Sequence, residues 1–175
     1  MGGLINMELW DLYDINLNPL NKTWERRKSR DQGIPDGEYH IVCDLLIRHA
    51  DGDFLLTRRD LNKEIAPGLW EASAGGSALA GETAEEAAYR EMFEETGLKA
   101  EKLEFVGNIV SEWSHSIFFS YVAYVSCDKN SFKLQEGETI DYKWVNLEGF
   151  FEFLESDEAL KGHNERYKKY IDTLR

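Results

Sequence analysis

The 175-residue chain lacks the features that mark several classes of protein. Its two cysteines, Cys43 and Cys127, have no zinc-ribbon or disulfide-framework spacing, which predicts a reducing, cytoplasmic location. No apolar run approaches the roughly 18 residues of a transmembrane helix, and the N-terminus does not resemble a signal peptide. Lys and Arg number 20 against 33 Asp and Glu, so we expect neither a nucleic-acid partner nor a membrane partner.

What the chain does contain favours one packed domain. Hydrophobic residues make up 42% of it and aromatic residues 13%, enough for a sizeable core in a chain of this length. Residues 1–6 are interpreted as an addition or an upstream start before Met7, and the single domain is expected over residues 7–175. The expected partner is a small molecule, and a homodimer stays open.

Apolar and β-branched runs separated by turn residues predict the secondary structure. Strands are expected over Glu8–Tyr13, His40–Arg48, Phe54–Thr57, Leu69–Ala74, Leu103–Val110, Ile117–Ser126 and Tyr142–Val145, and C-terminal helices over Leu147–Leu154 and Ser156–Leu174. This order, with one further helix in the middle, predicts an α/β fold in which helices sandwich a mixed sheet.

The middle helix is predicted from its two end signals. Thr83 followed by Glu86 three positions later is a capping box, and Gly97 suits the left-handed residue that stops a helix. The helix should therefore begin after Thr83 and end before Gly97.

This helix carries an unusual group of acidic residues. At about 100° per residue, Glu91, Glu94 and Glu95 share one face, where like charges repel. Arg90 can pair with Glu94 at i,i+4, but one arginine does not neutralise the group. A solvated charged helix is one interpretation. The other is a site for Mg²⁺ or Mn²⁺, which prefer clustered carboxylate oxygens.

The spacing around this helix resembles the Nudix box over its full length. Gly76, then Glu82, then the run REMFEETGL from Arg90 to Leu98 match the pattern without departure. Such a long motif is far more specific than a lone glycine motif. The resemblance implies a Nudix fold, an α/β/α sandwich with a mixed sheet, and metal-dependent hydrolysis of a nucleoside or other organic diphosphate linked to a group X.

The resemblance also implies roles within the box. Glu94 and Glu95 correspond to metal ligands, and Glu91 to a ligand or the base that deprotonates water. Arg90 corresponds to the residue that orients the glutamates, and Gly76 to a backbone carbonyl at the metal. The implied cofactor is Mg²⁺ or Mn²⁺.

Three residues outside the box are further candidates. Glu138, in the loop before Trp144-Val145, resembles the additional acid that Nudix proteins often supply, and is interpreted as a base or ligand or as an exposed loop acid. Arg58 and Arg59 close a strand directed toward the same region. They are interpreted as diphosphate-binding forks or as a surface pair.

The flanks LWDLYDIN, GEYHIVCDLLI and LTRRDLNKEIAPGLWE resemble isopentenyl-diphosphate isomerases and their hydrolase-like neighbours. An isomerase is therefore one alternative. However, isomerases place a catalytic Cys and a metal-binding His where this chain has Gly75 and Ser77. A non-catalytic diphosphate-binding regulator is the other alternative, although such proteins typically lose box glutamates and none is lost here.

Two histidines and two aromatic residues complete the candidates. His40 matches an isomerase metal ligand by position and is interpreted as strand packing or a substrate contact. His115 is interpreted as a substrate contact or a structural residue. Trp113 and Tyr121 are candidates to stack on a base, but we expect both in the core.

Overall fold

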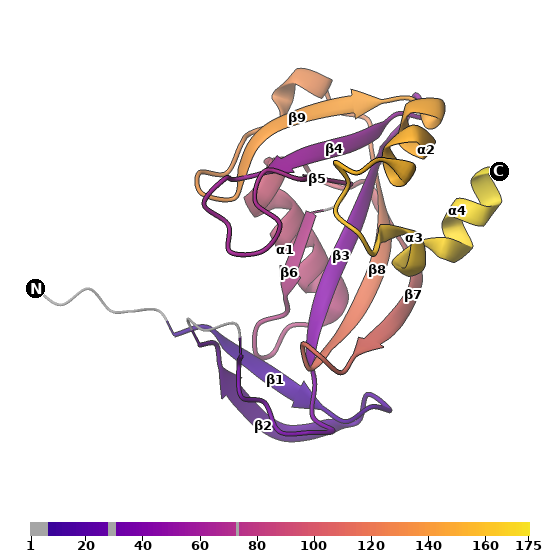
Figure 1. Ribbon diagram of the computed structural model, residues 1–175. Coiled ribbons are helices and arrows are strands. Elements are labelled where there is room, and N and C mark those ends of the chain that lie inside the picture. Colours follow the sequence, from indigo (N-terminus) through magenta and orange to yellow (C-terminus); the bar gives the residue numbers. More distant parts are fainter. Residues whose placement is uncertain (1–6, 28–30, 73) are drawn as a thin grey trace, which may run out of the picture.

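The computed structural model describes residues 7–27, 31–72 and 74–175. Its main sheet has the strand order β5-β4-β3-β8-β7, with β6 also paired to β3 and β9 to β4 (Figure 1). The strands are β3 (His40–His49), β4 (Phe54–Arg59), β5 (Trp70–Glu71), β6 (Ala74–Ser77), β7 (Lys102–Ser111), β8 (Ser116–Val125) and β9 (Thr139–Val145). Only β3 and β8 run parallel among these pairs, so the predicted mixed sheet is confirmed.

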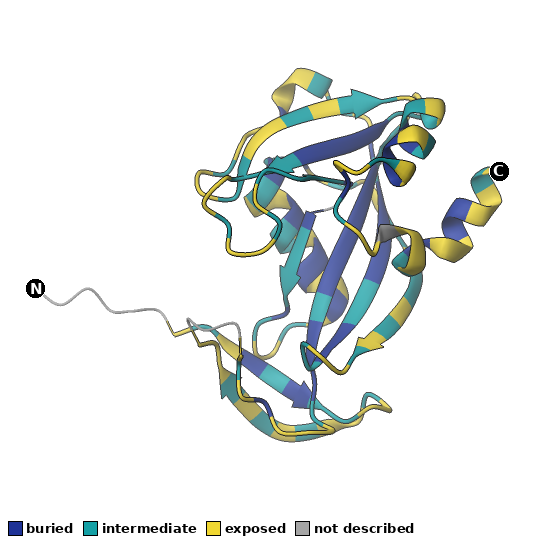
Figure 2. Cartoon of the chain, viewed as in Figure 1, coloured by how far each residue is buried: buried dark blue, intermediate teal, exposed yellow. Residues whose placement is uncertain are grey.

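Strand β3 lies at the centre of the sheet because its apolar residues are buried on both faces. Cys43, Leu45 and Ile47 pack on the side of helix α1 (Ala84–Thr96), whereas Leu46 packs with the C-terminal helices. Those helices are α2 (Leu147–Glu155), α3 (His163–Arg166) and α4 (Lys168–Leu174). A strand that is covered on both faces reads as a continuous hydrophobic run. The α/β/α sandwich is visible in Figures 1 and 2.

A separate hairpin stands at one end of the sandwich. Strands β1 (Leu9–Tyr13) and β2 (Pro19–Glu25) form their own antiparallel sheet (Figure 1). The Ala80 amide donates to the Leu9 carbonyl at 2.7 Å, and the Gly81 amide donates to the Asp11 carboxylate at 2.7 Å. The hairpin is thereby fixed beside the loop that leads into α1.

Three sequence predictions need correction. The single strand expected over 69–74 is two strands with different partners, since β5 pairs with β4 and β6 pairs with β3. The helix expected over 156–174 begins only at His163, because residues 158–160 instead run along β5, where Trp70 exchanges backbone hydrogen bonds with Glu158 and Leu160. Strand β2 was not predicted from the sequence. None of its residues is buried, since they alternate between exposed and half-buried, and the strand forms through its backbone pairing with β1.

Candidate active site

Helix α1 forms as its end signals predict. Thr83 Oγ1 accepts from the Glu86 amide at 3.2 Å, and the Glu86 carboxylate accepts from the Thr83 amide at 2.9 Å. Gly97 adopts φ 70° and its amide donates to the Phe93 carbonyl. Ala87, Ala88 and Met92 are fully buried against the sheet. Glu91 and Glu95 lie next to this buried side of the helix and are half-buried, whereas Glu94 is exposed.

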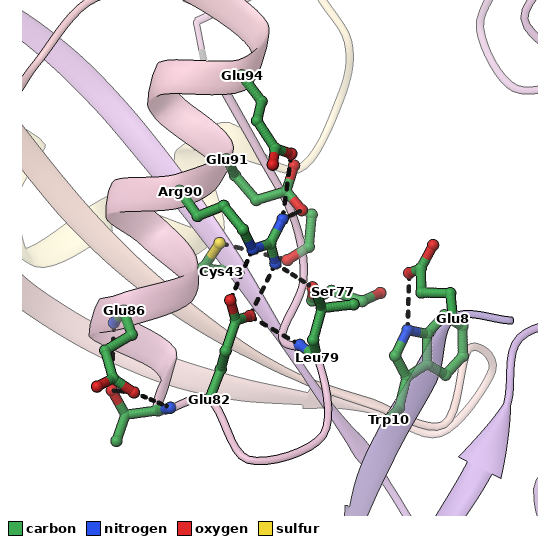
Figure 3. Close-up of polar contacts among 12 residues, drawn as sticks. Glu8, Trp10, Cys43, Ser77, Leu79, Glu82, Glu86, Arg90, Glu91 and Glu94 are labelled. Atoms are coloured by element: carbon green, nitrogen blue, oxygen red, sulfur yellow. Dashed lines mark hydrogen bonds and ion pairs between the residues drawn. The ribbon is translucent and has the colours of Figure 1, made fainter. Parts of the chain in front are cut away.

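Arg90 lies at the centre of the acidic group (Figure 3). Its Nε and Nη2 donate to the two Glu82 carboxylate oxygens at 2.7 and 2.8 Å. Its Nη1 donates to Glu91 at 2.6 Å and to Glu94 at 3.2 Å, and Nη2 also donates to the Ser77 carbonyl at 3.1 Å. The expected Arg90–Glu94 pair is confirmed. Hydrogen bonds to Glu82 and Glu91 raise the pKa of Arg90 above its ordinary value, so its charge is permanent.

Glu91 packs directly against the backbone of Gly76. A Cβ at position 76 would lie 2.6 Å from Glu91 Cδ, so any larger residue would displace this carboxylate. The Cys43 thiol donates to the Gly76 carbonyl at 3.3 Å. Burial raises the pKa of Glu91, and the Arg90 charge opposes that rise.

Glu95 is the carboxylate with the least compensation in the group. Its Oε2 accepts from the Gly75 amide at 3.1 Å. Burial raises the pKa of Glu95 well above its ordinary value, and the nearby Glu71, Glu91 and Glu138 raise it further. Ionised Glu95 is thus unfavourable unless positive charge is brought to it.

One cavity of about 690 Å³ brings these residues together. Its polar and charged lining comprises Glu8, Arg26, Lys63, Ser77, Arg90, Glu91, Glu94, Glu95, Gln135 and Glu138, and the backbone lining includes Gly75 and Gly76. Five box residues therefore share one cavity with Glu138, although Gly76 and Glu138 are 62 positions apart in the chain; the five are Gly76, Arg90, Glu91, Glu94 and Glu95.

The donor set of this cavity fits a divalent cation. Carboxylate oxygens and a backbone carbonyl are the hard ligands that such ions prefer. The glycine at position 76 leaves space for Glu91, and the raised pKa values of Glu91 and Glu95 indicate charge that a cation would stabilise. Within residues 7–27, 31–72 and 74–175, no three acidic, histidine or cysteine side chains already surround one point.

Lys63 is a cavity residue that the sequence did not predict. Its Nζ pairs with the Glu138 carboxylate, and the Asp60 amide donates to the Glu138 carbonyl at 2.9 Å. The loop after β4 and the loop before β9 are thus joined across the cavity rim. No pattern distinguishes Lys63 from other loop lysines in the sequence.

Arg58 and Arg59 lie outside this cavity lining. Arg58 Nε donates to the Gly68 carbonyl at 3.0 Å. Arg59 pairs with the Glu71 carboxylate at 3.1 Å and donates from Nε to the Ile65 carbonyl at 3.1 Å. These contacts hold the loop between β4 and β5. A diphosphate-binding role for either arginine stays a prediction.

His40 and His115 belong to a second cavity, of about 1170 Å³. The His40 ring stacks on Trp10 with centroids 4.0 Å apart, and its Nδ1 lies 3.0 Å from the His115 carbonyl. Burial lowers the pKa of His40 to about 4, so the ring is neutral at pH 7. The expectation that Trp113 is a core residue is wrong, because it is 70% exposed in the β7–β8 turn, whereas Tyr121 is buried as expected.

The family assignment rests on more than the box. The sequence profile of the NUDIX domain matches residues 38–173. The chain belongs to the Nudix family. The predicted Nudix fold and hydrolase class are thereby confirmed. Members of this family generally use divalent metal ions and act on small molecules.

Several relatives extend over much of the Nudix domain. The chain is 32% identical to the uncharacterized Nudix hydrolase lin0387 of Listeria innocua over 146 residues, covering 81% of this chain and 82% of lin0387. It is 40% identical to Nudix hydrolase lmo0368 of Listeria monocytogenes over 92 residues, 53% of this chain and about half (52%) of lmo0368. An isopentenyl-diphosphate Delta-isomerase of Corynebacterium diphtheriae is 35% identical over 80 residues, 46% of this chain and 44% of the isomerase.

A solved structure supports the same fold. DR0079 from Deinococcus radiodurans superposes with a TM-score of 0.69 at 19% identity, covering 93% of this chain and 98% of DR0079. At this identity the likeness concerns the fold alone. None of the described helices has the length and apolar character needed to cross a membrane.

Proposed function

We propose that this Nudix protein hydrolyses the pyrophosphate bond of an organic diphosphate and uses Mg²⁺ or Mn²⁺. The observation that carries the proposal is the single cavity that Glu91, Glu94, Glu95 and the backbone of Gly76 line together. Its unbalanced negative charge suits a cation, and a diphosphate needs cations to approach such a cavity. We also propose that the protein is cytoplasmic. Whether it forms a homodimer is left open in this proposal.

Each residue has a distinct task in this proposal. Glu94, Glu95 and the Gly76 carbonyl hold the cation, which when bound stabilises negative charge on the diphosphate and lowers the pKa of water. Arg90 fixes the orientation of Glu91 and Glu94 through its hydrogen bonds.

A carboxylate must also accept the proton of the attacking water. Glu91 and Glu138 both line the cavity and are the two candidates. The Lys63 ammonium pairs with Glu138 and lines the same cavity, where it could also bind a phosphate group.

The proposal is tested with a panel of diphosphates assayed with Mg²⁺, with Mn²⁺ and with EDTA. Mass spectrometry of both products identifies the bond that is cut. We expect turnover of at least one compound with either metal and none in EDTA. Equal turnover in EDTA contradicts metal dependence. Tight binding of a diphosphate without turnover favours the alternative of a non-catalytic, diphosphate-binding regulator.

An isomerase is the second candidate because isopentenyl-diphosphate isomerases are among the relatives. The backbone at Gly75 argues against it. A Cβ there would lie 2.2 Å from the Cys43 carbonyl oxygen, so a catalytic cysteine at this position needs a different backbone. Cys43 is no substitute, since burial raises the pKa of its thiol to about 12. Incubation with isopentenyl diphosphate in D₂O should give no deuterated dimethylallyl product; its formation with turnover would favour the isomerase.

A further inference from the structure

The β1–β2 hairpin and the two residues before it supply part of the wall of the carboxylate cavity. They precede residue 38, where the match to the Nudix domain begins. Met7, Glu8 and Leu9 nevertheless line the same cavity as the box glutamates. Leu79 and Ala80, in the loop that leads into α1, also line it. The hairpin and this loop therefore both belong to the surroundings of the proposed metal site.

Two hydrogen bonds join the hairpin to this loop. The Ala80 amide donates to the Leu9 carbonyl, which is a contact between two backbones. The Gly81 amide donates to the Asp11 carboxylate at 2.7 Å, and this contact depends on a side chain. Asp11 lines neither of the two large cavities. Any effect of Asp11 on the site must therefore pass through the residues that it holds.

The residue after Gly81 is Glu82, which holds Arg90. The Leu79 amide donates to Glu82 Oε2 at 2.8 Å, and the Glu82 amide donates to the Leu79 carbonyl at 2.9 Å. The two Glu82 carboxylate oxygens accept from Arg90 Nε and Nη2 (Figure 3). The fold of the loop thus places the Glu82 carboxylate, and this carboxylate places the Arg90 guanidinium.

We propose that Asp11 is a positioning residue of the active site. It holds the Gly81 amide and thereby fixes the turn in which Glu82 is directed at Arg90. Arg90 in turn orients the box glutamates through its other hydrogen bonds. The role of the cation in this inference rests on the proposed function, whereas the link from Asp11 to Arg90 does not. The hairpin is then a required part of the site, although it lies outside the matched domain.

The first measurement uses the full chain without metal. NMR follows the exchange with solvent of the Arg90 Nε proton, which is slowed by its hydrogen bond to Glu82. Asp11→Ala removes the acceptor of the Gly81 amide, so the exchange should become about 2- to 10-fold faster. Asp11→Asn keeps a side-chain oxygen that can accept the same bond, so its exchange rate should stay close to that of the wild type. If Asp11→Ala does not fold, Asp11→Ser replaces it, since the serine hydroxyl ends one bond short of the carboxylate oxygen.

The second measurement is the affinity of the full chain for Mn²⁺, determined by calorimetry. Asp11→Ala should weaken Mn²⁺ binding by about 3- to 10-fold, less than the loss of a direct partner of a metal ligand would. Asp11→Asn should restore most of the affinity. The double variant of Asp11→Ala and Glu82→Gln should bind Mn²⁺ no more weakly than Glu82→Gln alone, because both changes act through Arg90.

Asp14→Ala is the matched control within the hairpin. The Asp14 carboxylate accepts from the Asn16 and Asn18 amides in the β1–β2 turn, and Asp14 lines neither cavity. This variant should leave the Arg90 exchange rate and the Mn²⁺ affinity unchanged.

The proposal is overturned if Asp11→Ala leaves either measurement unchanged, or if Asp14→Ala has the same effect as Asp11→Ala. It is also overturned if the losses of Mn²⁺ affinity from Asp11→Ala and Glu82→Gln add up in the double variant. Absence of Mn²⁺ binding by the wild type would instead contradict the proposed function, and the exchange rate would still decide whether Asp11 positions Arg90.

Discussion

The two faces of the central sheet differ in whether their buried carboxylates are matched by positive charges. On the face of the C-terminal helices, Asp44 of β3 is buried and pairs with Arg166 at 2.8 Å. The Arg166 guanidinium also lies 4.4 Å from the centroid of the Phe118 ring. One carboxylate is thus neutralised by one guanidinium, and this ion pair links helix α3 to strand β3.

On the α1 face the acidic side chains outnumber the basic ones that pair with them. Arg90 alone serves Glu82, Glu91 and Glu94, while Glu95 accepts from a backbone amide. Burial raises the pKa of both Glu91 and Glu95, which shows that their charges are held at a cost. A cluster that lowers the stability of the metal-free protein is best explained by function. The two faces should therefore respond differently to the same chemical change, the replacement of a carboxylate by an amide.

The largest effect is expected on catalysis from the α1 face. Glu94→Gln and Glu95→Gln should each lower kcat by a factor on the order of 10² or more, because each removes a proposed metal ligand. The metal-free fold should be retained, since a repelling charge is lost. Asp172→Asn is the matched control; its carboxylate pairs with Lys168 on α4. Folded glutamine variants with wild-type kcat would contradict the metal-site assignment.

On the opposite face, the amide should affect stability instead. Asp44→Asn leaves Arg166 without its counter-charge and should lower the free energy of unfolding by about 2 kcal/mol. This is below the usual value for a fully buried pair, because the Arg166 side chain is 22% exposed. Urea denaturation measures the loss, and kcat of the remaining folded protein should match the wild type. An unchanged midpoint would show that the pair is not stabilising.

The contrast between the faces explains which features could be predicted from sequence. Helix α1 was predicted to the residue because its capping box at Thr83 and its stop at Gly97 are local signals. The shared position of Glu91, Glu94 and Glu95 was likewise predicted, since they lie within a turn and a half of one helix, and all three line one cavity. The role of Glu82 as the bidentate partner of Arg90 was not predicted, because it depends on how the loop before α1 folds back.

Predictions that depended on tertiary packing were less successful. The contacts of Arg58 and Arg59 with loop carbonyls and Glu71 could not be predicted, and a diphosphate-binding role for either stays a prediction. Trp113 looks like a core residue in the sequence, yet it sits in a tight turn that directs it outward. Sequence periodicity reports which residues are apolar, whereas only the assembled sheet decides what lies opposite them.

A smaller effect should come from closing the space beside Glu91. Gly76→Ala would put a methyl group against the Glu91 carboxyl group, which must then move away. Because the displaced atoms are the end of a flexible side chain, unfolding free energy should change by less than about 1 kcal/mol. The Mg²⁺ concentration for half-maximal activity should rise about tenfold. An unaltered Mg²⁺ dependence in Gly76→Ala would refute the close packing of Glu91 at the metal.

The smallest effect, and the most direct measure of the charge imbalance, is the pH dependence of stability without metal. The folded-state pKa of Glu95 is raised above its ordinary value of 4.5 by burial. Between these two pKa values the folded chain keeps a proton that the unfolded chain has released. Stability in EDTA should therefore fall as pH rises through this window.

Urea titrations of wild type and Glu95→Gln from pH 5 to pH 8, in EDTA, isolate the contribution of this residue. The amide does not titrate, so the stability of Glu95→Gln relative to the wild type should grow as pH rises. Added Mg²⁺ should stabilise the wild type more than the variant, because binding to the folded state is linked to its stability. For Asp172→Asn, the free energy of unfolding should change with pH and with added Mg²⁺ by the same amount as for the wild type. Parallel curves for Glu95→Gln and the wild type would mean that the buried charge on the α1 face is already neutralised within the protein, and the distinction between the two faces would disappear.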